Sequence, residues 1–138
     1  MKKIHKNISQ KTLEAKNQYR NEIDLLRGRL NLLNGKDKVL LTMYLENGNS
    51  FRQIARLTGI SDTSIARRIN GLTKRLLDSQ YIICLRNRDK FSREQMTIAK
   101  AYFLTGMSMR EIAIKRRWSC YHVRETIIKI KSILNDCG

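Results

Sequence analysis

The feature that most constrains this chain is an internal repeat with a period of 58 residues. Residues 42–55 read TMYLENGNSFRQIA, and residues 100–113 read KAYFLTGMSMREIA. The shift aligns turn residues, helix caps and apolar residues alike, so the chain contains two tandem copies of one structural unit. The aligned pairs are Tyr44 and Tyr102, Gly48 and Gly106, Ser50 and Ser108, Arg52 and Arg110, Ile54 and Ile112, Ala55 and Ala113, Ser61 and Ser119, and Ile65 and Val123.

The first copy contains the stretch 50–69, SFRQIARLTGISDTSIARRI, which predicts a short helix, a tight turn and a longer helix. Ala55 is small enough for two helices to cross closely, and Gly59 suits a turn with positive φ. Ser61 offers an N-cap to the next helix, which Ile65 anchors in the core. This spacing is typical of a helix-turn-helix, whose second helix lies in the major groove of DNA. An ordinary helical hairpin in a bundle is the alternative. The residues expected to face the core are Ile54, Ala55, Ile60, Ile65 and Ile69.

The second copy differs in its turn, because Arg117 stands at the position of Gly59 and Trp118 at that of Ile60. A residue other than glycine adopts the left-handed conformation at some cost, so we expect this turn to differ in shape. We interpret Trp118 as a core residue and not as a platform for base stacking. The last helix is expected over residues 119–134, with the inward positions Val123, Ile127, Ile130 and Leu134.

The N-terminal part predicts one amphipathic helix over residues 9–33. Its apolar positions follow a 4-3-4-3 spacing, which is typical of a coiled-coil seam or a docking stripe. Packing onto the chain's own body and homodimerisation both remain open. The stripe consists of Tyr19, Ile23, Leu26, Leu30 and Leu33. A second helix is expected over residues 36–46, with the inward positions Val39, Leu40, Met43 and Tyr44.

The chain has no proline and only seven glycines, which suits helices joined by short turns. We therefore expect an all-α fold, with two tandem helix-turn-helix units preceded by an N-terminal amphipathic helix. Residues 81–85, YIICL, are β-prone and predict a linker on the core, favoured here, or a short wing-like strand. The expected segments are 1–35 for the N-terminal helix, 36–79 for the first unit, 80–90 for the linker or strand, and 91–138 for the second unit.

The charge balance favours a polyanionic partner. Lys and Arg number 28 against 12 Asp and Glu, giving a net charge of +16 that is spread along the whole chain. DNA, RNA and an anionic membrane surface all satisfy this requirement. No apolar run approaches the roughly 20 residues that span a bilayer, and we expect no membrane partner. The basic N-terminus lacks the apolar core of a secretion signal, so we expect a cytoplasmic protein.

Motifs for catalysis or metal binding are missing from the sequence. The three cysteines Cys84, Cys120 and Cys137 are widely spaced, and the two histidines do not complete a zinc site. We interpret the cysteines as reduced thiols. The sequence has no glycine-rich phosphate loop and no pairing of nucleophile with base, so we expect neither an enzyme nor a cofactor.

The residues expected to read bases lie on the first turns of each copy's second helix. Arg67 can pair with guanine and Asn70 with adenine, while Thr63 or Ala66 can contact a thymine methyl. The candidates in the first copy are Ser61, Asp62, Thr63, Ala66, Arg67 and Asn70. Those in the second copy are Ser119, Cys120, Tyr121, Arg124, Glu125 and Ile128. The candidates for phosphate contacts are Arg52, Arg56, Arg68, Lys74, Arg110, Lys115, Arg116 and Arg117.

A resemblance to a known family is carried by residues 39–69, VLLTMYLENGNSFRQIARLTGISDTSIARRI. They resemble the promoter-reading helix-turn-helix, region four, of bacterial sigma factors. The second copy, SREQMTIAKAYFLTGMSMREIA, is similar to the same module and to the LuxR-type DNA-binding domain, which shares G-x-S-x-x-E-I-A. The resemblance implies that Asp62, Thr63, Ala66 and Arg67 face the −35 promoter element.

These observations lead to a sequence-specific regulator of transcription that binds double-stranded DNA. In a chain of 138 residues, we do not expect the separate sigma domain that grips RNA polymerase and melts DNA. We therefore expect a sigma-like regulator encoded by a phage or mobile element, with RNA polymerase as a further candidate partner. One alternative is the DNA-binding subunit of a recombination or transposition system. Another is an accessory protein that binds RNA or RNA polymerase.

Overall fold

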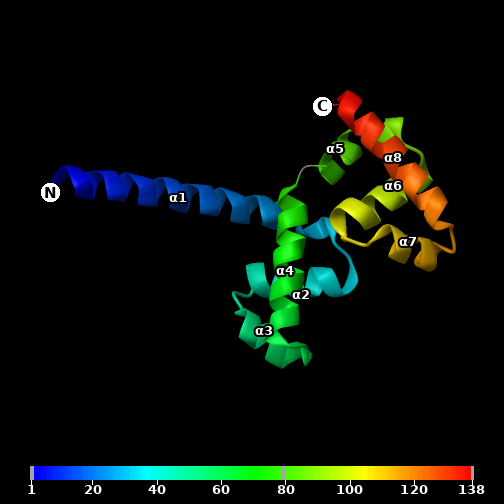
Figure 1. Ribbon diagram of the computed structural model, residues 1–138. Helices are drawn as coiled ribbons and strands as arrows, with labels where there is room; N and C mark the ends of the chain where they lie inside the picture. The colour runs from blue at the N-terminus through cyan, green and yellow to red at the C-terminus, as the bar shows by residue number, and fades with distance from the viewer. Residues whose placement is uncertain (1, 79, 138) are drawn as a thin grey trace. The chain divides into compact units, whose positions relative to one another are not determined.

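The computed structural model describes residues 2–78 and 80–137, with side chains from residue 12 onward (Figure 1). This part of the chain contains eight α-helices and no strand, which confirms the predicted all-α fold. In the same part, no helix is both long and apolar enough to cross a membrane. The elements are α1 (Lys2–Arg29), η1 (Leu30–Leu32), α2 (Gly35–Leu45), α3 (Phe51–Thr58), α4 (Asp62–Leu77), α5 (Gln80–Arg86), η2 (Arg88–Lys90), α6 (Arg93–Ala99), η3 (Lys100–Leu104), α7 (Met109–Arg116) and α8 (Cys120–Cys137).

The chain divides into two compact units, Met1–Gly59 and Ile60–Gly138. The first unit contains α1, α2 and α3, and the second contains α4 to α8. The boundary falls in the turn between α3 and α4.

In the first unit, the end of α1 and the turn η1 form a small core with α2. Leu26, Leu30 and Leu33 are buried, as are three leucines of α2. The side chain of Arg27 donates from Nη2 to the carbonyl of Leu45 at 3.2 Å, which ties α1 to the end of α2. Val39 is 57% exposed, so its predicted inward position is wrong. The buried leucines of α2 follow Val39 directly, and each residue turns the helix by about 100°.

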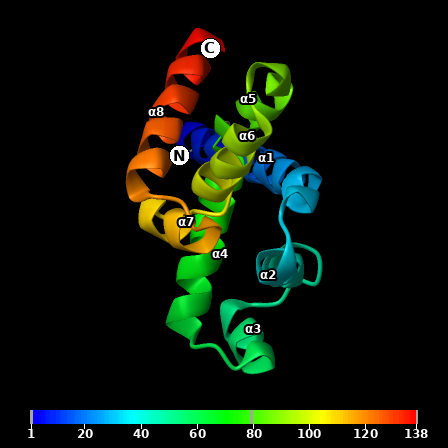
Figure 2. The ribbon, with the colours of Figure 1, turned by 90° about the vertical axis from the view of Figure 1, so that its right-hand side faces the viewer.

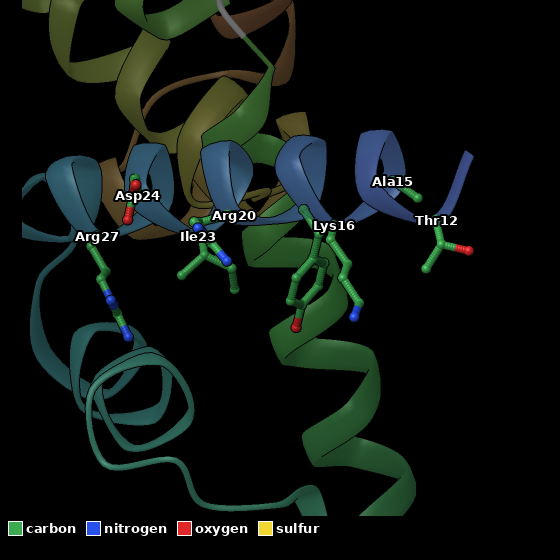
Figure 3. Close-up of a pocket in the computed structure, with 8 residues that line it drawn as sticks. Thr12, Ala15, Lys16, Arg20, Ile23, Asp24 and Arg27 are labelled. Carbon is green, nitrogen blue, oxygen red and sulfur yellow. The ribbon is translucent and has the colours of Figure 1, made fainter. Parts of the chain in front are cut away.

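The predicted stripe of α1 is buried only at its C-terminal end. Tyr19 is 63% exposed, whereas Leu26 is 5% exposed. Figure 3 shows the side chains along this part of α1, from Thr12 to Arg27, on one side of the helix. Polar and charged side chains alternate there with Ala15, Tyr19 and Ile23.

In the second unit, α6 and α7 pack against α8, and α5 packs against α8, α6 and η3 (Figure 2). The core is apolar and includes Ile98, Leu104, Ile112, Val123, Ile127 and Ile130, each at most 2% exposed. The strand alternative for residues 81–85 is wrong, because they belong to α5. Tyr81 and Cys84 are three residues apart and are both buried on one face of this helix. The apolar run thus covers the core as a helix.

The 58-residue repeat of the sequence recurs in the helix bounds. α3 and α7 have matching first and last residues under this shift, and α4 and α8 have matching first residues. Burial follows the repeat as well. The buried pairs are Leu40 and Ile98, Leu41 and Ala99, Leu45 and Phe103, Ile54 and Ile112, Ala55 and Ala113, Ile65 and Val123, Ile69 and Ile127, and Leu72 and Ile130.

Backbone hydrogen bonds repeat with the same period. The amide of Asn49 donates to the carbonyl of Met43 at 3.0 Å, and the equivalent bond in the second copy is 2.9 Å long. Ser50 caps α3 by accepting from the amide of Gln53, and Ser108 caps α7 in the same way. The two copies therefore share their local backbone structure from the end of α2 to the start of α4.

The two turns also have the same conformation. Gly59 has φ 75° and ψ 10°, and Arg117 has φ 58° and ψ 37°, so both lie in the left-handed region. Each closes the preceding helix, Gly59 by donating its amide to the carbonyl of Ala55 and Arg117 by donating to those of Ala113 and Ile114. The expectation that the second turn would differ in shape is therefore wrong. The backbone of Arg117 is strained in this conformation, whereas Gly59 has no Cβ and adopts it without strain.

Candidate nucleic-acid interface

The first group of predicted base-reading residues lies at the N-terminal half of α4. Ser61 is the N-cap of this helix, and its Oγ accepts from the amide of Ser64 at 3.2 Å. The same hydroxyl donates to Oγ of Ser64 at 2.9 Å. The Ser61 hydroxyl thus both accepts and donates a hydrogen bond within the protein. Its first role is to cap α4, and base reading comes second.

The inward face of α4 is apolar throughout. Ile65, Ile69 and Leu72 are each 0% exposed. This face fixes which side chains α4 presents to the solvent, because a helix turns by about 100° per residue. Ala66 is half-buried at the edge of the inward face. The other first-copy candidates are all exposed, and they are Asp62, Thr63, Arg67 and Asn70.

We define the α4 outer face as the stripe formed by Thr63, Ala66, Arg67, Asn70 and Lys74. Their spacing of three and four residues places them along one side of the helix. Two of them are cations, and none is a carboxylate. Asp62 lies beside this stripe in the first turn, where its charge favours the helix N-terminus.

The second group of candidates lies at the start of α8. Ser119 precedes this helix, and its Oγ accepts from the amide of His122 at 3.0 Å. The guanidinium of Arg124 lies 5.7 Å from the centre of the Tyr121 ring, a cation–π contact between two exposed side chains. Glu125 is half-buried, whereas Cys120 and Ile128 are exposed.

Trp118 is only half-buried, so its interpretation as a core residue is wrong. Its ring lies edge-on to the imidazole of His122, with 5.6 Å between the ring centres. The Nε2 atom of His122 is paired with the carboxylate of Glu94 at the start of α6. Ile60, the equivalent of Trp118, is 41% exposed, so its predicted core-facing position is wrong as well. Both residues follow a left-handed turn residue and lie outside the inward stripes of the adjoining helices.

The candidates for phosphate contacts are exposed in both units. Arg52 and Arg56 lie on α3 in the first unit. In the second unit, α4 carries Arg68 and Lys74, and the other candidates belong to α7 and the turn after it. These other candidates are Arg110, Lys115, Arg116 and Arg117. Their exposure gives a polyanion access to these cations.

Sequence reasoning missed the role of Arg75. This side chain donates from Nε to the carbonyl of Leu104 at 2.9 Å and from Nη2 to that of Thr105 at 3.2 Å. It therefore connects the end of α4 to the loop that precedes α7. No local pattern marks this residue among the 28 lysines and arginines, since its partners are backbone carbonyls about 30 residues away in the sequence.

The cysteines occupy three different environments. Cys84 is buried, Cys120 is exposed and Cys137 is half-buried, and all three are free thiols. Burial raises the pKa of the Cys84 thiol to about 11, and the nearby Cys137 adds to this shift. Within residues 12–78 and 80–137, no group of three or more His, Cys, Asp or Glu side chains could hold a metal ion.

The arrangement offers hydrogen-bond donors and positive charge on exposed helix faces. Such surfaces can bind the phosphate backbone and the base edges of a duplex. Comparison of the chain with protein-family models, curated proteins and solved structures found no match.

Proposed function

We propose that this chain is a sequence-specific regulator of transcription that binds double-stranded DNA, as a sigma-like protein does. In this proposal, the α4 outer face enters the major groove and reads bases. The N-cap Ser61 begins the helix that carries this face. In this proposal, the protein acts by binding and not by catalysis.

The observation that carries the proposal is the chemistry of the α4 outer face. Thr63, Arg67 and Asn70 are exposed on successive turns directly after a helix N-cap. These side chains present a methyl group, a guanidinium and an amide, which together can discriminate among base pairs in the major groove. Ile65 and Ile69 on the opposite face of this helix are fully buried, so the reading side chains lie on the face directed away from the core.

The positive charge supports the same proposal. The net charge of +16 provides attraction to any duplex, independent of its sequence. Exposed cations beside the reading face, such as Arg68, supply contacts to phosphates that fix the register of the helix in the groove. Affinity for DNA in general and discrimination between sequences thus come from different side chains.

Selection from random duplex DNA followed by affinity measurement tests the proposal. The full-length protein is expected to enrich a discrete motif and to bind it at least 100-fold more tightly than a scrambled duplex at moderate salt. Arg67→Ala is expected to lower the affinity for the motif by about 5- to 150-fold, because a bidentate contact contributes about 1–3 kcal/mol. Its affinity for the scrambled duplex should change much less.

Arg88→Ala is the matched control, because Arg88 is an exposed cation of η2 outside both predicted reading groups. This control should bind the motif within about twofold of the wild type. Equal losses for Arg67→Ala and Arg88→Ala would show that only net charge matters. Recovery of no motif, or equal affinity for motif and scrambled duplex, would contradict the proposal.

A further inference from the structure

The second copy lacks the chemistry that suits the first copy to DNA. The shift of 58 residues aligns the α4 outer face with one stripe on α8. We name this stripe the α8 outer face. It consists of Tyr121, Arg124, Glu125, Ile128 and Ser132.

The differences between the two faces are specific. Glu125 stands at the position of Arg67, and Ser132 at that of Lys74. The α4 outer face has two cations and no carboxylate, whereas the α8 outer face has one of each. The position of a cation suited to DNA thus holds a carboxylate, which a phosphate backbone repels.

The α8 outer face also exposes two large side chains, Tyr121 and Ile128, on either side of Arg124 and Glu125. Tyr121 is 65% exposed where the first copy has Thr63, and Ile128 is 53% exposed where it has Asn70. Residues seven apart lie on the same side of a helix, two turns from one another. Tyrosine is enriched at the centres of protein–protein interfaces, where charged groups are depleted. These two side chains therefore form a surface that suits another protein better than a duplex.

The charges around this surface indicate the charge that a partner should carry. Residues 117–131 contain the cations Arg117, Arg124, Lys129 and Lys131 and the single carboxylate Glu125. Tyr121 and Ile128 thus lie among side chains of net positive charge. A second copy of the chain would bring a further charge of +16 against it, and this repulsion disfavours self-association. An acidic partner gains attraction instead.

We propose that the α8 outer face is a docking surface for an acidic, amphipathic helix of another protein. The partner helix places apolar side chains against Tyr121 and Ile128, and its flanking carboxylates face the surrounding cations. In this mode of recognition one helix packs against another, and the contacting residues are spaced by three, four and seven positions. The proposal assigns Tyr121, Arg124 and Glu125 to a protein partner and leaves base reading to the first copy.

A selection from a displayed library of 18-residue helical peptides, randomised on one face, tests this proposal. The full-length protein is the bait, and the variant Tyr121→Thr/Ile128→Asn, which introduces the first-copy residues, is the counter-bait. The expected clones have net negative charge and at least two apolar residues spaced by three, four or seven. Synthetic peptides from these clones should bind the double variant at least tenfold more weakly than the wild type.

Controls separate this result from misfolding and from DNA binding. Because both replaced side chains are exposed, the double variant should keep the helical circular dichroism and melting temperature of the wild type. The matched variant Thr63→Ala/Asn70→Ala should bind the peptides as the wild type does. The double variant should bind the DNA motif within about twofold of the wild type. The peptide result stands whether or not the chain recognises a DNA sequence.

Several outcomes would overturn the proposal. These are the absence of any clone enriched by the wild type over the double variant, and enrichment of neutral or basic peptides. A tenfold loss of DNA affinity in the double variant, with peptide binding unchanged, would assign the face to DNA. A dimer of the wild type that the double variant abolishes in sedimentation equilibrium would assign it to a second copy.

Discussion

The guanidinium of Arg75 lies so close to Gly106 that a Cβ added to this glycine would be 2.4 Å from Cζ of the arginine. Gly106 itself has φ 79°, in the left-handed region. The close approach lets the guanidinium donate to the carbonyls of Leu104 and Thr105. Two requirements, a positive φ and the absence of a side chain, therefore meet at one residue, and glycine satisfies both.

Gly106→Ala should accordingly destabilise the protein more than the equivalent change in the first copy. The left-handed conformation costs an alanine about 1 kcal/mol, and displacement of the guanidinium adds about 1.5–3 kcal/mol of lost hydrogen bonding. Gly48→Ala is the control, because Gly48 has φ 68° but a Cβ added to it would have no neighbouring atom within 4 Å. Urea denaturation measures both free energies of unfolding. Equal losses would show that the Arg75 contact contributes nothing.

Arg117→Gly should stabilise the protein, because Arg117 has φ 58° and glycine adopts this conformation without a Cβ clash. We expect a gain of about 1 kcal/mol in the free energy of unfolding. Arg116→Gly removes the same charge from the last residue of α7, where helical backbone favours arginine, and should cost up to about 1 kcal/mol. Thermal denaturation compares the two. If Arg117→Gly made the protein less stable to heat, the inference that Arg117 is strained at this turn would be contradicted.

The repeat makes much of the fold predictable from the sequence. Caps such as Ser61, turn residues such as Gly59 and inward positions such as Ile65 depend on local backbone geometry, which short-range patterns record. The repeat then carries these assignments from the first copy to the second. The inward spacing of α8 follows from Val123 in the same way.

The errors arise where tertiary packing overrides local preference. Residues 81–85 are β-prone, yet they form a helix because Tyr81 and Cys84 can then be buried on one face. Trp118 is apolar, which favours the core, but at its turn position it is only half-buried, beside His122. The contact of Arg75 with a distant loop has no local signal. Of the candidate site, the sequence predicts which residues are exposed on α4, whereas the cation–π pair on α8 requires the structure.

The stability of the protein should fall at alkaline pH because the buried thiol of Cys84 loses its proton. An unfolded thiol titrates near pH 8.5, as a rough average, whereas burial raises the pKa of Cys84 to about 11. The folded state thus holds this proton more tightly. The contribution is complete below about pH 8.5 and is lost as the pH rises toward 11, by up to about 1.4 kcal/mol per pH unit.

Cys84→Ala is expected to flatten this dependence when unfolding by urea is measured between pH 8 and 11. Some slope should remain, since burial also raises the pKa of Tyr81. Cys120→Ala, which changes an exposed thiol, should keep the full slope. In a thiol-labelling assay, Cys120 should react first and Cys84 last. Identical slopes for the wild type and Cys84→Ala would contradict the buried environment of this thiol.

The salt dependence of DNA affinity should distinguish the residues that contact phosphates from those that read bases. Each phosphate neutralised contributes about −0.9 to the slope of log affinity against log salt concentration. Arg68→Gln and Lys74→Gln should each reduce the magnitude of this slope by about 0.9, measured by fluorescence anisotropy on the selected duplex. Arg88→Gln, outside the proposed interface, should leave it unchanged. Equal reductions for all three variants would indicate attraction by net charge alone.

The central claim is that the α4 outer face is the surface that meets DNA. Titration of ¹⁵N-labelled, full-length protein with its selected duplex, followed by amide NMR shifts, tests this claim most directly. We expect the largest shift changes within residues 61–70, with smaller ones at the exposed cations and little change at Ile128. Unchanged amides over residues 61–70, with the main changes on α1 or on the α8 outer face, would contradict it.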